Sequence, residues 1–124
     1  MVGLKNKHGK KGKSMKANQY QELAARTINS ELAKWEIEAH ALHLMAGEVG
    51  ELHSLYQKHY QGHSYTEEHY KKEIGDLLWG IAEYCTVKGW KLEDIMQLNI
   101  EKLKARYPEG FEAGKSLHRR EGDI

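Results

Sequence analysis

Apolar residues recur along the chain at the three- and four-residue spacings that are typical of amphipathic helices. This pattern predicts four helices, at about residues 18–32, 37–60, 67–88 and 92–106. Asn18 and Thr66 are candidate N-caps, Gly89 follows the third helix, and Pro108 cannot continue the fourth. No segment of four or more residues alternates cleanly enough to predict a strand. The sequence therefore predicts an all-α, four-helix-bundle-like single domain.

The composition agrees with one globular domain, because 124 residues suffice for a single core and 40% of them are hydrophobic. No apolar run approaches the length of about 18 residues that predicts a membrane span. The basic N-terminus is not followed by the apolar segment of a secretory signal. We therefore expect a cytoplasmic protein without a membrane partner. The single cysteine, Cys85, lies in an apolar run and is expected to be buried and unreactive.

Charge is distributed unevenly along the chain. Residues 1–16 carry six lysines and no acidic residue, which leaves 13 basic and 18 acidic residues in the remainder. We expect residues 1–16 to form a basic, flexible tail and residues 17–124 to form the domain. The tail could contact nucleic acid through charge alone, but we prefer the interpretation of a solvated tail, so a nucleic-acid partner is not expected.

Two acidic pairs interrupt the apolar pattern of the second and third helices: Glu48 with Glu51, and Glu73 with Asp76. Residues three apart share a helix face, and a short connection makes the two helices antiparallel neighbours. Two carboxylates at about 4 Å repel by roughly 4 kcal/mol at an effective dielectric near 20, so four of them need a counter-charge or protons. Oxygen ligands select Mg²⁺, with Mn²⁺ as a substitute. A solvated acidic face is the alternative.

Glycine and histidine residues near the acidic pairs give weaker evidence about the site. Gly47, Gly50, Gly75 and Gly80 flank the acids and predict close backbone approach, either of another helix or of a ligand. A ferritin-like di-iron site is disfavoured, because no glutamate has a histidine three residues later. Zinc capture by His59 and His63 is an alternative at the turn between the second and third helices, although Gly62 interrupts the helix there.

The fourth helix places Asn99, Lys102 and Arg106 on one face. Arginine binds phosphate oxygens in a bidentate way, so this face could neutralise a phosphate chain. A solvated face that complements the helix C-terminus is the alternative. Trp35 lies just ahead of the first acidic pair and is a candidate for nucleobase contact.

Three segments follow one another along the chain: Ala46–Glu51, Glu73–Trp79 and Asn99–Phe111, with 21 residues between Glu51 and Glu73. Together they resemble the single-domain MazG-like nucleotide pyrophosphohydrolases, which belong to the all-α NTP pyrophosphohydrolase superfamily. The resemblance covers about residues 18–120. It implies hydrolysis of an NTP or dNTP to the monophosphate and pyrophosphate, and a dimer or dimer of dimers with active sites near subunit interfaces.

The resemblance also implies roles for individual residues. Glu48, Glu51, Glu73 and Asp76 would be the metal ligands and catalytic groups, one of them orienting or deprotonating the attacking water. The substrate-binding residues would be Asn99, Lys102 and Arg106, with Lys58 a weaker candidate at the end of the second helix. The alternative function is a non-catalytic helical module that binds nucleotide or nucleic acid through the basic tail.

Overall fold

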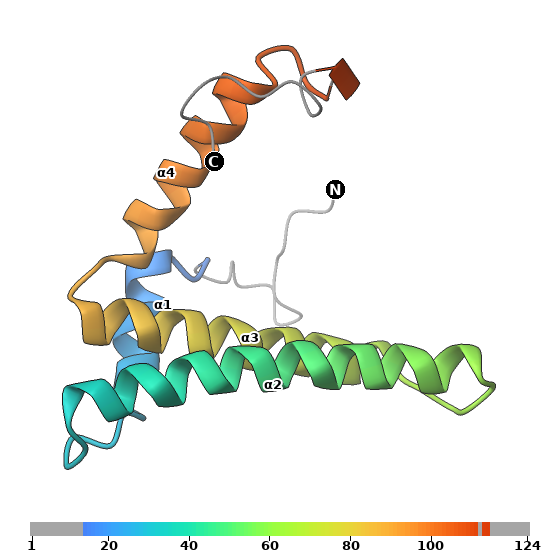
Figure 1. Ribbon diagram of the computed structural model, residues 1–124, viewed down its shortest axis with the longest axis horizontal. Coiled ribbons are helices and arrows are strands. Elements are labelled where there is room, and N and C mark those ends of the chain that lie inside the picture. The colour runs from blue at the N-terminus through green and yellow to red at the C-terminus, as the bar shows by residue number, and fades with distance from the viewer. Residues whose placement is uncertain (1–13, 112, 115–124) are drawn as a thin grey trace, which may run out of the picture.

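The computed structural model describes residues 14–111, 113 and 114, and it contains four helices (Figure 1). They are α1 (Ala17–Ala25), α2 (Lys34–Tyr60), α3 (Glu67–Lys88) and α4 (Leu92–Arg106). No strand is present among the described residues, so the predicted all-α class is confirmed. None of the described helices is long and apolar enough to cross a membrane. Most of the predicted tail, residues 1–13, lies outside the described residues.

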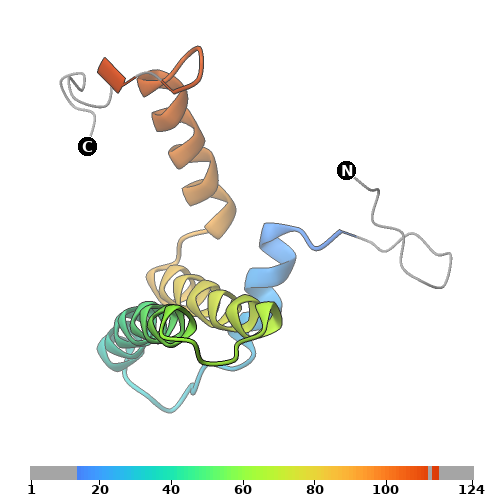
Figure 2. The ribbon, with the colours of Figure 1, turned by 90° about the vertical axis from the view of Figure 1, so that its right-hand side faces the viewer.

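The two long helices, α2 and α3, pack side by side as an antiparallel hairpin (Figures 1 and 2). Small residues bring them together: Ala41 and Ala82 are fully buried. A Cβ on Gly80 would lie only 2.9 Å from the Cγ of Met45 and 3.4 Å from the carbonyl oxygen of Ala41. The predicted close helix approach is therefore confirmed at Gly80, where a larger residue would collide with the side chain of Met45.

The other three glycines of the acidic segments do not mediate helix packing. A Cβ added to Gly47, Gly50 or Gly75 would meet no atom of the described chain within 4 Å. The prediction that another helix approaches these positions is wrong for the helices that the structure describes. Approach of a ligand to them stays a prediction.

The ends of α3 are defined by the predicted caps. The hydroxyl oxygen of Thr66 accepts a hydrogen bond from the backbone N–H of His69 at 3.1 Å, which satisfies one donor of the first turn. At the other end Gly89 adopts a left-handed conformation with φ of 76°, which side chains disfavour and glycine tolerates. The buried thiol of Cys85 lies one turn earlier, and burial raises its pKa, as expected for an unreactive cysteine.

Helix α1 is shorter than predicted, and its N-cap is Lys16 rather than Asn18. The apolar spacing continues to Leu32, but the side chain of Asn29 accepts a hydrogen bond from the backbone N–H of Glu31 at 3.0 Å and favours a turn. The Nε1 of Trp79 on α3 donates to the Thr27 hydroxyl at 2.8 Å, which fixes this turn against the hairpin.

Helix α4 is anchored to α1 at its start. The side-chain oxygen of Gln21 on α1 accepts the backbone N–H of Leu92 at 2.7 Å, and its amide nitrogen donates to the carbonyl of Trp90 at 2.8 Å. Leu92 is buried, but beyond this first turn α4 extends away from the hairpin (Figures 1 and 2). The exposed apolar residues of α4 are Ile95, Met96, Leu98, Ile100 and Leu103. The four helices therefore do not close into one bundle within the described chain.

Candidate metal centre

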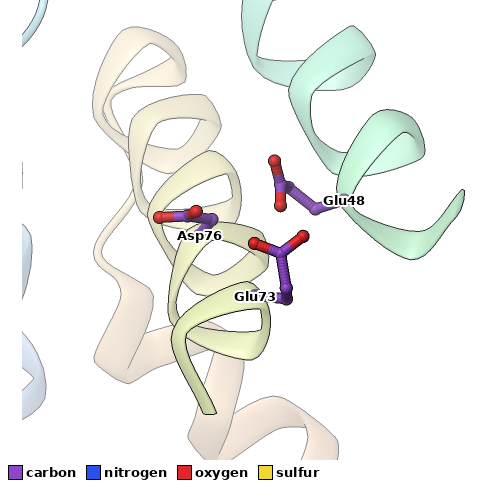
Figure 3. Close-up of side chains that lie close together, drawn as sticks. All are labelled: Glu48, Glu73 and Asp76. Atoms are coloured by element: carbon purple, nitrogen blue, oxygen red, sulfur yellow. The ribbon is translucent and has the colours of Figure 1, made fainter. Parts of the chain in front are cut away.

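Three carboxylates meet across the α2–α3 hairpin (Figure 3): Glu48 from α2, and Glu73 and Asp76 from α3. Each offers one oxygen, and these oxygens all lie within 4.8 Å of one another. Glu73 and Asp76 are one turn apart and share a side of α3, and Glu48 faces them from the neighbouring helix. All three side chains are half-buried. The structure thus brings together three of the four acids singled out from the sequence.

The electrostatics of this acidic group are unfavourable without a counter-charge. The pKa of Glu48 is raised above its ordinary value of 4.5, first because burial removes solvent and then because Glu73, Asp76 and Glu51 are negatively charged. The Oε2 atom of Glu48 is buried and accepts no hydrogen bond within the described part of the chain. A buried acceptor without a partner is costly and calls for a cation or a proton.

The donor set fits a hard divalent cation. Carboxylate oxygens are the ligands preferred by Mg²⁺ and Mn²⁺, and a cation would pair with the buried Oε2 atom of Glu48. Among the residues that the structure describes, no group of three or more potential ligands includes a histidine. The ring of His59 stacks instead on Tyr65, with centroids 3.6 Å apart. The described residues therefore do not support the zinc alternative at His59 and His63.

Glu51 lies outside the group of three. Its side chain is exposed on α2, one turn after Glu48, although its charge contributes to the raised pKa of Glu48. The structure therefore brings together three half-buried acids between the helices and leaves the fourth predicted acid exposed, one turn away on α2.

Tyr20 is a neighbour of the acidic group that the sequence motifs do not single out. Burial, and then the negative charge of Asp76, raise the pKa of its hydroxyl group. Tyr20 comes from α1, which packs on α3. No spacing in the sequence indicates this proximity, because it depends on how α1 crosses the hairpin.

The remaining site candidates lie away from the acidic group in the same chain. At a rise of about 1.5 Å per residue, Lys58 is roughly 15 Å and Trp35 roughly 20 Å from Glu48 along α2. Trp35 is 68% exposed. Asn99, Lys102 and Arg106 are on α4, which extends away from the hairpin (Figure 1).

A helical hairpin with three convergent carboxylates defines an all-α protein with a candidate site for a hard divalent cation. The family model of the MazG nucleotide pyrophosphohydrolase domain matches residues 37–111, more than half of the chain. The chain therefore belongs to the MazG nucleotide pyrophosphohydrolase family, and the resemblance of its three segments is confirmed. Neither the comparison with curated proteins nor that with solved structures yields a match. Family membership supports nucleotide pyrophosphohydrolase activity in general.

Proposed function

We propose that this protein is a Mg²⁺-dependent hydrolase that converts an NTP or dNTP to the monophosphate and pyrophosphate. The acidic group of Glu48, Glu73 and Asp76 is the observation that carries this proposal. Its oxygens come from two helices, converge within 4.8 Å and include a buried acceptor without a hydrogen-bond partner in the described chain. A structural role alone does not explain such an arrangement, because three like charges oppose the packing of α2 on α3.

In this proposal Glu48, Glu73 and Asp76 hold Mg²⁺, with Mn²⁺ as a substitute. A bound divalent ion supplies Lewis acidity toward the phosphate oxygens and lowers the pKa of a coordinated water. Glu51 lies at the solvent edge of the group, where its carboxylate can orient the attacking water and accept its proton. The water oxygen attacks the α-phosphorus, the bond from this phosphorus to the bridging oxygen breaks, and pyrophosphate leaves.

Phosphate binding is assigned to Lys102 and Arg106, with Asn99 nearby and Lys58 as a weaker candidate. Because α4 extends away from the acidic group of its own chain, we propose that these groups serve the site of a second copy (Figure 1). The exposed apolar residues of α4 support such a homo-oligomer, a dimer or a dimer of dimers. A helix of 15 residues is only marginally stable in water unless its apolar face is covered.

Trp35 is also proposed as a contact to the nucleobase bound at the site of a second copy. Its ring is exposed and lies roughly 20 Å along α2 from Glu48, so it can reach a substrate only at the acidic group of a neighbouring copy. The proposed location of the enzyme is the cytoplasm. The alternative of a non-catalytic module depends on the basic tail, whose residues 1–13 lie outside the described residues.

The test is release of pyrophosphate from a panel of NTPs and dNTPs with Mg²⁺, compared with the same reactions in a chelator. We expect metal-dependent release by the wild-type protein. Deletion of residues 1–14 separates the two functions: unchanged turnover supports the hydrolase, and absence of turnover in the full chain with any nucleotide refutes it.

A further inference from the structure

Aromatic side chains gather at the end of the hairpin where α2 connects to α3, and the acidic group does not use them. A pocket of about 460 Å³ lies between them. It is lined by Tyr56, His59, Tyr65, Glu67, Tyr70 and Lys71. Its volume falls in the range of small-molecule sites. We call it the aromatic pocket.

The rings of the aromatic pocket support one another. His59 and Tyr65 are stacked, with centroids 3.6 Å apart and planes inclined by 30°. Tyr56 meets His59 edge-on at 5.9 Å, and Tyr70 meets Tyr65 edge-on at 5.7 Å. Tyr56 and Tyr65 nevertheless remain 59% and 42% exposed. Rings that are held in place but left open to solvent offer faces and edges for a planar aromatic ligand.

The aromatic pocket also has polar groups that could pair with such a ligand. The hydroxyl oxygen of Tyr70 is buried and has no hydrogen-bond partner within the described residues. Burial and the neighbouring Tyr65 and Tyr56 raise the pKa of this hydroxyl, so it keeps its proton and can donate. Glu67 and Lys71, one turn apart on α3, add an acceptor and a donor to the lining. The pocket thus offers both hydrogen-bond donors and acceptors, which match the donors and acceptors along the edge of a nucleobase.

The aromatic pocket and the acidic group follow the same two helices. Tyr70 precedes Glu73 by one turn on the same side of α3. On α2, His59 comes eleven residues after Glu48, which returns it to the same side at roughly 16 Å along the axis, and Tyr56 is roughly 12 Å away. Cleavage between the α- and β-phosphates requires the α-phosphorus to lie at the acids, so the sugar and base of a bound nucleotide are free to extend along the hairpin toward the aromatic pocket.

We propose that the aromatic pocket is the nucleobase subsite of this hydrolase, where the base of an NTP or dNTP stacks against Tyr65 and Tyr56. The substrate class in this proposal rests on the proposed function. The aromatic pocket, together with the Trp35 ring proposed above to come from a neighbouring copy, then determines which base is accepted. The acidic group determines where the phosphate chain is cut.

The experiment compares Tyr65→Leu with Tyr60→Leu in steady-state hydrolysis of each nucleotide of the panel. Tyr60 is an exposed tyrosine of the same hairpin end that does not line the pocket, although its ring meets that of Tyr56 edge-on at 5.7 Å. Tyr60→Leu therefore controls for the loss of a tyrosine ring that only supports the pocket from outside. We expect Tyr65→Leu to raise KM about tenfold, the effect of losing one stacked base, and to leave kcat unchanged. Tyr60→Leu should behave as the wild type. An unchanged KM in Tyr65→Leu overturns the proposal.

Two further measurements separate a base subsite from other roles. Inorganic triphosphate has no base, so its inhibition constant should be equal in the wild type and in Tyr65→Leu; a rise that parallels KM overturns the proposal. Sedimentation of both variants should give the wild-type mass. If Tyr65→Leu changes the oligomeric state instead of KM, the pocket is a contact between copies and the proposal is wrong.

Failure of the proposed function has a different result. If the wild-type protein hydrolyses no nucleotide, calorimetry with α,β-methylene nucleotides and Mg²⁺ tests the pocket by itself. Binding that Tyr65→Leu weakens and Tyr60→Leu preserves supports a nucleobase subsite in a non-catalytic protein. If the wild-type protein does not bind these nucleotides, or if both variants bind them equally well, the nucleobase subsite is refuted as well as the hydrolase.

Discussion

The Nδ1 atom of His40 on α2 lies 2.9 Å and 3.0 Å from the two carboxylate oxygens of Glu83 on α3. Glu83 is only 6% exposed and is the one buried charged side chain among the described residues, whereas the side chain of His40 is 52% exposed. The imidazole therefore links a buried acid to the solvent side of the hairpin. Glu83 follows Asp76 by seven residues, two turns further along the same side of α3. The pair thus links the two helices that form the acidic group.

Replacing His40 by alanine should lower the free energy of unfolding by about 1–3 kcal/mol, because it leaves the buried carboxylate of Glu83 without this partner. Denaturant titration followed by circular dichroism measures this loss. In the double variant His40→Ala, Glu83→Gln the loss should be smaller than the sum of the two single losses. Additive losses would show that the two side chains do not stabilise each other.

Local sequence determined much of this fold. The bounds of α3 and α4 agree with the predicted ranges, because Thr66, Gly89 and Pro108 act on the backbone within one turn. The acidic group of Glu48, Glu73 and Asp76 was also predictable, since i and i+3 spacing on two antiparallel helices makes their carboxylates converge. In each case the cause lies within a few residues of its effect.

The parts that were not predictable depend on packing between distant segments. The apolar pattern of α4 is typical of a helix face that packs into the core of its own chain. Nothing in this pattern indicates that the helix leaves the hairpin after Leu92. The proximity of Tyr20 to Asp76 depends on how α1 crosses α3. Periodicity shows which face of a helix is apolar, but it does not show which element, or which copy of the chain, covers that face.

The raised pKa of Glu48 predicts how stability depends on pH and metal. In the folded state Glu48 holds its proton to higher pH than its ordinary value of 4.5, so the unfolded chain binds fewer protons in this interval. Without a divalent cation, ionisation of Glu48 should therefore lower stability as pH rises from about 4.5 through the folded-state pKa. Thermal unfolding in a chelator measures this fall. It should be absent in Glu48→Gln, and an identical fall in that variant would contradict the assignment.

Magnesium should reverse this effect, since a cation offsets the repulsion within the acidic group. We expect Mg²⁺ to raise the Tm of the wild-type protein more at pH 7 than at pH 5, where protons compete for the carboxylates. Glu73→Gln should lose most of this increase. The conservative change Glu68→Gln is a matched control, because Glu68 is an exposed acid of the same helix outside the group. A Tm that does not respond to Mg²⁺ would contradict the metal site.

Loss of a single carboxylate should abolish most of the activity without loss of the fold. Asp76→Asn removes one negative oxygen from the group and should lower kcat by about 10²–10³, the range expected when several kcal/mol of charge stabilisation are lost. Glu51→Gln should lower kcat by a similar factor if the exposed carboxylate orients and deprotonates the attacking water. Pyrophosphate release gives both rates, and far-ultraviolet circular dichroism checks the helices. A threefold loss or less in Glu51→Gln would assign the chemistry to the other three acids.

The N-cap of α3 supports the site indirectly, because it defines where the helix that carries Glu73 and Asp76 begins. Thr66→Ala removes the acceptor of the His69 N–H bond and should cost about 1 kcal/mol in the free energy of unfolding. Thr66→Ser keeps the hydroxyl group and should retain most of the stability. Equal losses in the two variants would mean that the methyl group of Thr66, rather than its hydroxyl, stabilises the helix start.

Mixing two impaired variants tests whether α4 of one copy serves the acidic group of another. Arg106→Ala should lower kcat/KM by about 10- to 100-fold, as expected for a lost charged hydrogen bond to phosphate. When chains with Asp76→Asn and chains with Arg106→Ala are unfolded together and refolded, half of the dimers are mixed. In each mixed dimer the intact acidic group of one chain meets the intact α4 of the other, so one of its two sites is complete. Roughly a quarter of the wild-type activity should therefore return in a two-fold symmetric dimer.

The control for this experiment mixes Asp76→Asn with Glu48→Gln, where both defects fall in the acidic group and no activity should return. If the first mixture is as inactive as its parents, Arg106 acts within its own chain, and α4 must then fold back onto the hairpin when substrate binds.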